Sequence, residues 1–311
     1  YSSLGANTTG ANNTASGYQA LNDNTTGGQN AAFGYRALYE NTTASNNSAF
    51  GNQAMQNNTT GTSNVAIGYE SLKANTTGFK NTSVGSGSAI DNTTGDNVAA
   101  FGYNTLANNT TADDNTGLGS QAMFTNTTGA KNTAVGTGAM YNNTTASYNT
   151  AVGAESLDAN TTGEHTTALG YGALGANTTA SNNTSVGSEA LAANTTGANN
   201  TAVGVAALKT NTTGAYNTAI GGKSLDANTT GNYNAAIGYH ALGGNTTGVG
   251  NSAIGYGALF DNTTGGDNTG LGRNALANNT TANNNTAIGS QALLTNTTGA
   301  NNVALGNNAM Y

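Results

Sequence analysis

Residues 194–210 read NTTGANNTAVGVAALKT, and the architecture follows from this stretch of 17 residues. The pattern recurs along the whole 311-residue chain without insertion or deletion. Self-similarity at a fixed period is typical of repeat architectures. We number the repeat positions from 1, the Asn of each Asn-Thr-Thr, to 17. Position 1 is occupied by Asn7, Asn24, Asn41, Asn58, Asn75, Asn92, Asn109, Asn126, Asn143, Asn160, Asn177, Asn194, Asn211, Asn228, Asn245, Asn262, Asn279 and Asn296.

Positions 7 to 10 have the length of a short strand. In the copy quoted above they are Asn200-Thr201-Ala202-Val203, and Gly204 follows at position 11, which is Gly in every copy. In a strand, positions 8 and 10 face one way and positions 7 and 9 the other. Gly at positions 4 and 11 marks corners that need a positive φ or a close backbone approach.

One repeat is therefore predicted to form one coil of a solenoid. Helical repeats are excluded because the chain has no apolar i, i+3, i+4, i+7 stripe, although one helical turn at positions 12 to 16 stays open. The predicted fold is all-β: a parallel β-solenoid (β-roll) of 18 coils with a 17-residue repeat. Residues 1–311 form a single repeat domain without a linker, expected to be a segment of a longer rod.

Coils stacked about 4.8 Å apart place equivalent side chains in columns. Asn at positions 1 and 7 is predicted to hydrogen-bond from coil to coil and to cap corner backbone groups. Val or Ile at position 10 and Leu or Met at position 15 are predicted to form dry columns. Because such a core is thin, we expect a trimer or a fibre in which Ala at position 9 permits close approach. A single narrow coil is the alternative.

The composition argues against several classes of protein. Charged residues make up 7% of the chain, and the net charge of −7 is spread thinly, which does not suit nucleic-acid binding. No run of 18 apolar residues predicts a membrane span, and the lack of Cys excludes disulfides.

Two copies of the strand carry a resemblance to a known family. Asn200-Thr201-Ala202-Val203-Gly204 and Asn285-Thr286-Ala287-Ile288-Gly289 resemble the strand motif of YadA-type heads in trimeric autotransporter adhesins. Similar strings occur in phage and viral tail-fibre-like repeat proteins. The resemblance implies a left-handed parallel β-roll formed by three chains. This chain differs in its longer period and its Asn-Thr-Thr corner, and it shows no neck, coiled-coil stalk or anchor.

Each Asn-Thr-Thr is also a sequon for N-glycosylation. Eighteen sequons at one repeat position predict a column of covalent glycans on the position-1 asparagines. The alternative is an Asn/Thr ladder without sugar. Thr at position 2 never varies, and an O-glycan, a sugar contact or a Thr ladder would each explain it. Asn at position 7 is interpreted as a structural ladder.

Catalytic, metal and cofactor sites are not predicted. His165 and His240 lie at different repeat positions and are interpreted as surface residues. Asp113 and Asp114 are adjacent and are interpreted as solvated charges rather than a calcium site. Tyr recurs at position 12, where it either stacks on sugars or neighbouring chains or has no role beyond the surface. An enzyme needs one unrepeated constellation of groups, which a near-uniform chain does not offer.

The expected function is that of an extracellular structural fibre or filament coated with N-glycans, on a cell or virion surface or outside the cell. The alternative is an adhesin head or tail-fibre shaft that binds host surfaces. That function requires a patch that breaks the repeat, and the sequence does not reveal one. An ice-binding solenoid is the third alternative. It needs flat ranks of outward Thr, and positions 2 and 3 supply only one.

Overall fold

The computed structural model describes residues 2–310 and confirms the parallel β-solenoid. The described residues contain 18 strands of three residues each and no helix. They fall into two compact units: residues up to Glu155 with Asn160–Thr162, and Ser156–Ala159 with residues from Gly163 onward. The strands of the first unit are β1 (Thr14–Ser16), β2 (Ala31–Phe33), β3 (Ser48–Phe50), β4 (Val65–Ile67), β5 (Thr82–Val84), β6 (Ala99–Phe101), β7 (Thr116–Leu118), β8 (Thr133–Val135) and β9 (Thr150–Val152). Those of the second are β10 (Thr167–Leu169), β11 (Thr184–Val186), β12 (Thr201–Val203), β13 (Thr218–Ile220), β14 (Ala235–Ile237), β15 (Ser252–Ile254), β16 (Thr269–Leu271), β17 (Thr286–Ile288) and β18 (Val303–Leu305).

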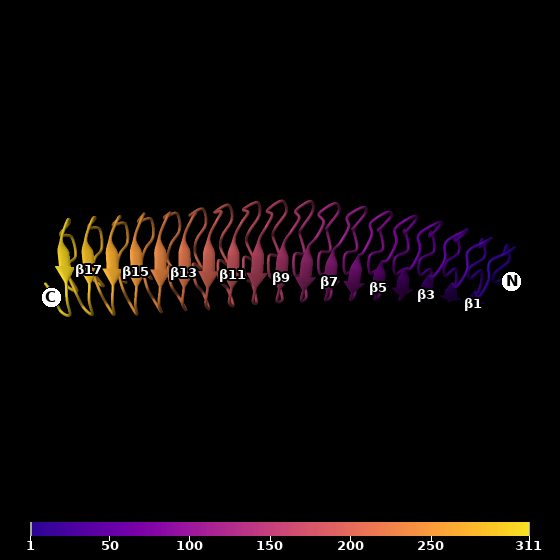
Figure 1. Cartoon of the computed structure of the whole chain (residues 1–311), viewed down its shortest axis with the longest axis horizontal. Coiled ribbons are helices and arrows are strands. Elements are labelled where there is room, and N and C mark those ends of the chain that lie inside the picture. The colour runs from indigo at the N-terminus through magenta and orange to yellow at the C-terminus, as the bar shows by residue number, and fades with distance from the viewer. Residues whose placement is uncertain (1, 311) are drawn as a thin grey trace. The chain divides into compact units, whose positions relative to one another are not determined.

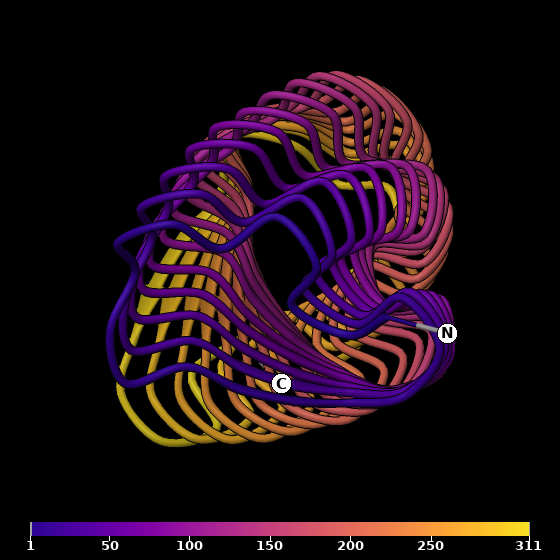
Figure 2. The same cartoon turned by 90° about the vertical axis from the view of Figure 1, so that its right-hand side faces the viewer.

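Within each unit, every strand pairs in parallel with the next strand along the chain. Thr201 of β12 lies opposite Thr218 of β13, one period later, and all pairings within a unit keep this register. Figure 1 shows successive strands side by side, and the end view in Figure 2 shows the coils of each unit following the same path. The period predicted the register because any other offset would place unlike repeat positions together.

The interior of the coil is narrow. Ala at position 9, the small residue at position 14 and Leu or Met at position 15 are buried, as Ala202, Ala207 and Leu208 show. Position 9 holds only Ala, Ser or Gly, and it adjusts to its neighbours: Thr105 at position 14 is matched by Gly117, where a Cβ atom would lie 2.6 Å from the Thr105 side chain. The predicted dry column at position 15 is confirmed.

The position-11 corner requires Gly. These glycines have φ between +123° and +147°. A Cβ at Gly204 would lie 2.6 Å from the carbonyl carbon of Gly221, so the two backbones stack directly on each other. The positive φ and the close backbone contact each exclude a side chain at position 11, which explains why this position is always Gly.

Positions 12 to 16 form turns, and the helical turn that the sequence left open is absent from residues 2–310. Positions 6, 13 and 15 repeatedly adopt left-handed backbone, where the non-glycine residues have φ between +46° and +63°. Leucine adopts this conformation at position 15 in most coils, as at Leu208 and Leu225. The left-handed winding of the solenoid and the single repeat domain stay predictions.

Candidate functional site: the outer face of the strands

The sequon asparagines lie inside the coil, which contradicts the predicted glycan column. Sixteen of the 18 position-1 asparagines are fully buried, and Asn7 and Asn296 are half-buried. Asn211 Nδ2 donates to Asn194 Oδ1 of the preceding coil at 2.8 Å and to the Gly214 carbonyl at 2.9 Å. An N-glycan would replace one of these N–H groups and would have no path to solvent. The 16 buried asparagines therefore have no room for sugars in the folded chain, and only Asn7 and Asn296 at the two ends of the column are partly accessible.

The invariant Thr at position 2 has a structural reason. The Thr212 hydroxyl donates to the Thr229 carbonyl of the next coil at 3.0 Å, and the same bond recurs along the chain. Thr213 at position 3 is exposed instead. Of the three explanations that the sequence left open, the Thr ladder is the one that these bonds support.

Asn at position 7 forms the second polar column, as predicted. The Asn200 side chain donates to the Gly214 carbonyl at 2.8 Å, and the backbone N–H of Asn217 donates to Asn200 Oδ1 at 2.9 Å. The position-4 carbonyl thus accepts from both Asn columns. Two ranks of asparagines satisfy the corner backbone that the coil buries.

The apolar residue at position 10 faces outward, so its predicted dry column is wrong. Ala at position 9 of each strand points into the coil, and the alternation of a strand then turns positions 8 and 10 to the outside. Ile254 is 43% exposed and Leu271 is 42% exposed. The reason is space, because the interior at this level accepts nothing larger than a small residue.

We call positions 8 and 10 of the strands the outer face. Within each unit the position-10 residues form an exposed, largely apolar column, and the rings of Phe33 and Phe50 stack with centroids 4.9 Å apart. The other large members that are exposed are Ile67, Phe101, Leu118, Leu169, Ile220, Ile237, Ile288 and Leu305. Contiguous exposed apolar surface of this kind commonly marks an interaction site.

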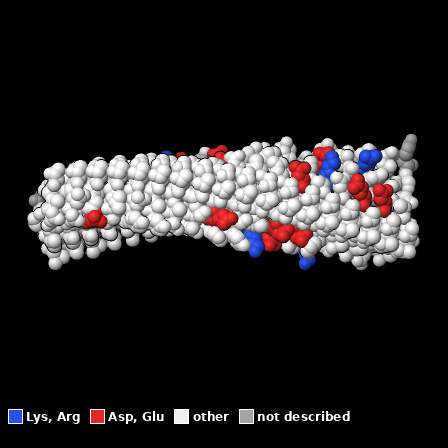
Figure 3. Space-filling view, turned by 90° about the horizontal axis from the view of Figure 1, so that it is seen from above, with Lys and Arg blue, Asp and Glu red and all other residues white. Residues whose placement is uncertain are grey.

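The outer face carries no charge in any copy. All 21 charged residues occupy positions 5, 6, 12, 13, 16 or 17 of the repeat. Figure 3 shows how sparse Lys, Arg, Asp and Glu are on the side of the molecule that it presents. Two such outer faces would meet without like-charge repulsion.

The fold does not bring together the Asp113–Asp114 pair, His165 and His240. Asp113 and Asp114 are exposed, and Asp113 Oδ1 accepts a hydrogen bond from the Asp96 backbone N–H at 2.8 Å. His165 is exposed, whereas His240 is half-buried beside Tyr239 and Phe260. Among residues 2–310, no group of three or more His, Asp and Glu side chains is placed to hold a metal ion.

The Tyr residues of position 12 lie at the surface next to the outer face. Tyr18 and Tyr35 stack with ring centroids 5.3 Å apart, and Tyr239 and Tyr256 stack at 5.9 Å. Tyr256 is 58% exposed, which leaves a ring face open to solvent.

The chain matches no family model, and no curated protein is significantly similar to it in sequence. The resemblance to adhesin heads and tail fibres stays a prediction. In the part of the chain that the structure describes, no helix has the length and apolar character needed to cross a membrane.

Proposed function

We propose that this protein is a non-catalytic structural protein that assembles laterally into fibres through the outer face, with a second copy of the same chain as its partner. The observation that carries the proposal is the exposed apolar column at position 10. A location outside the cell, or on a cell or virion surface, belongs to the same proposal and rests on the sequence. A glycan coat on the Asn-Thr-Thr column is no longer part of it, because those amides are buried.

A second copy suits this face better than an unrelated partner does. The face repeats once per coil, about every 4.8 Å, so an identical chain presents apolar side chains at a matching interval. Side chains of two such columns can interdigitate, as they do between packed sheets. The absence of charged residues from the outer face matters equally, because a chain with a net charge of −7 otherwise repels its own copies.

Lysine substitutions on the outer face test this proposal. Ile220→Lys, Ile254→Lys and Ile288→Lys place charges two coils apart on the exposed column. The matched control is Thr213→Lys, Thr247→Lys and Thr281→Lys, which adds the same charge at exposed position 3. Sedimentation velocity and electron microscopy should show fibres for the wild type and the control, and dispersed chains for the outer-face variant. Far-UV circular dichroism checks that all three fold.

Two results would contradict the proposal. One is a wild-type protein that stays monomeric at concentrations of tens of micromolar. The other is an outer-face variant that assembles as well as the control does.

A second candidate function is adhesion, as expected of an adhesin head or tail-fibre shaft. It is favoured by one observation: the surface is hollowed around Gly257 and Ala277, where two variable positions of the repeat hold small residues. The sequence did not reveal this patch, because its residues come from different copies of the repeat.

A further inference from the structure

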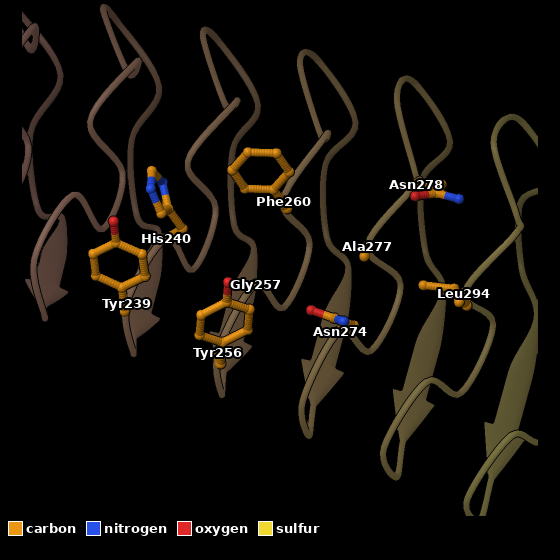
Figure 4. A pocket seen from close by; sticks show the side chains of 9 residues that line it. All are labelled: Tyr239, His240, Tyr256, Gly257, Phe260, Asn274, Ala277, Asn278 and Leu294. Carbon is orange, nitrogen blue, oxygen red and sulfur yellow. The ribbon is translucent and has the colours of Figure 1, made fainter.

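The second unit carries an open hollow of about 480 Å³ beside the outer face. Pockets for small ligands commonly measure about 300–1,000 Å³. The hollow spans the four coils that contain β14, β15, β16 and β17, and Figure 4 shows the side chains around it.

Two small residues create the hollow. Position 13 holds His240, then Gly257, then Asn274 in successive coils, and position 16 holds Phe260, then Ala277. Gly257 and Ala277 therefore leave space between the larger side chains of the neighbouring coils. A ladder of equal side chains would close this space.

Aromatic rings form one wall. Tyr239 and Tyr256 stack with an interplanar angle of 20° and are 49% and 58% exposed, so they make a platform of two rings. His240 stands edge-on to Tyr239, with ring centroids 4.3 Å apart, and edge-on to Phe260 at 5.4 Å. His240 thus packs against both of these rings at the wall of the hollow.

His240 also has a buried polar atom without a hydrogen bond in the part of the chain that the structure describes. Its Nδ1 atom is buried and has no hydrogen-bond partner among residues 2–310. A polar nitrogen that is buried without a hydrogen bond destabilises the folded chain. Folding alone does not call for a ring that carries such a cost, because Gly and Asn occupy the same position in the next two coils.

Besides the tyrosine hydroxyls and the His240 imidazole, the polar side chains of the hollow are amides. Asn274 and Asn278 border it, and none of the lining residues is Asp, Glu, Lys or Arg. An amide both donates and accepts hydrogen bonds. The hollow thus combines a flat apolar wall with paired donors and acceptors, and no carboxylate, ammonium or guanidinium group lines it.

We propose that this hollow binds a neutral saccharide of one or two pyranose rings. The C–H face of a pyranose packs against the Tyr239–Tyr256 platform, and its hydroxyls exchange hydrogen bonds with the amides of Asn274 and Asn278. The inference deepens the second candidate function, on which it rests, and is independent of fibre assembly.

An array of neutral and charged oligosaccharides, probed with the full-length wild-type protein, provides the first test. The expected result is binding to neutral members, and maltotetraose and cellotetraose are then titrated by calorimetry together with the best array ligand. An array without signal, or with signal only for charged members, overturns the proposal.

Two tyrosine variants locate the site. Tyr256→Ala removes half of the platform and should weaken saccharide binding at least tenfold. Tyr233→Ala is the matched control, because Tyr233 is 64% exposed and stacks on Tyr216 away from the hollow. Asn278→Ala, at an exposed position, should also weaken binding while the circular dichroism spectrum stays that of the wild type.

Equal loss of binding in Tyr233→Ala, or full binding in Tyr256→Ala, would place the saccharide elsewhere and overturn the assignment. Fibre formation is followed separately by sedimentation. A failure of saccharide binding with intact fibres therefore removes only the adhesive function.

Discussion

Asn211 illustrates how a polar side chain can occupy the inside of a thin coil. Its Nδ2 donates to Asn194 Oδ1 and to the Gly214 carbonyl, while its Oδ1 accepts from Asn228 at 2.8 Å. Its side chain therefore bonds to asparagines in both neighbouring coils and to the position-4 carbonyl of its own coil. A buried amide is tolerated only when it is satisfied in this way.

Asn211→Ala should lower the free energy of unfolding by about 1–3 kcal/mol, because it leaves buried partners in two neighbouring coils unsatisfied. Thr213→Ala, two residues away and exposed, should change it by less than about 0.5 kcal/mol. Urea denaturation followed by circular dichroism measures both. Similar destabilisation in the two variants would show that the Asn column does not stabilise the coil.

Asp226 makes stability depend on pH in the second unit. Burial raises the pKa of its carboxyl above the ordinary value of 3.8, although the charges of His240, Lys223 and Lys209 act to lower it. The folded chain therefore holds this proton more tightly than the unfolded chain. The resulting stability is present at pH values below 3.8 and is lost as the pH rises through the pKa of the folded state.

Asp226→Asn imitates the protonated carboxyl and should raise the melting temperature at pH 7. The difference from the wild type should shrink towards pH 3, where both side chains are neutral. Thermal melts at a series of pH values measure it. A variant that melts below the wild type at pH 7 would mean that the neighbouring positive charges outweigh the burial.

At the scale of the element, the corner at position 11 sets how closely two coils approach. Gly204→Ala combines left-handed strain of about 1–2 kcal/mol with a collision, since the new Cβ would lie 2.6 Å from the Gly221 carbonyl carbon. We expect a loss of stability above that strain alone.

Gly222→Ala is the control for that corner. A Cβ there would lie 3.4 Å from the Tyr239 ring, an ordinary contact, so stability should be nearly unchanged. The denaturation midpoints of Gly204→Ala and Gly222→Ala measure this difference in stability. If Gly204→Ala were as stable as Gly222→Ala, backbone stacking would not explain why position 11 is always Gly.

Strand alternation could be predicted from the sequence, but not which side of the strand faces inward. The pattern paired position 8 with 10 and position 7 with 9, and the structure confirms both pairs. Large apolar residues usually lie inside, which favoured Val203 over Ala202 as the core residue. The opposite holds because the asparagine columns and the position-15 side chains fill the interior, which leaves room only for a small residue at position 9.

The sequon misled for a related reason. Asn-x-Thr describes what a glycosylating enzyme recognises, whereas the same residues at a corner can satisfy buried backbone. The strict spacing supports either interpretation. Only the burial of Asn211 and its neighbours separates the two, and burial depends on how the coil closes.

At the scale of the whole molecule, the period controls which insertions and deletions the chain tolerates. Removal of residues 194–210 takes out one coil and should place β11 opposite β13 in the same register. In solenoids, stability is roughly the sum of the repeats and their interfaces. The shortened chain should therefore keep its circular dichroism per residue and unfold at nearly the same urea concentration.

Removal of Ala198 alone is the control. That coil would keep only 16 residues, and its later positions could not align with those of both neighbours. We expect a large loss of stability, although 16 fewer residues are removed than in the full-coil deletion. Equal tolerance of both deletions would argue against columns in register.

The left-handed leucines bear on how such a chain acquires its structure during synthesis. Each non-glycine residue in that backbone region costs about 1–2 kcal/mol, and the coil repeats the conformation at up to three positions. A lone coil cannot meet that cost, since its hydrogen bonds run to the coils on either side. Order must therefore begin with several coils together, after which each finished coil serves as the template on which the next one emerging from the ribosome is laid down.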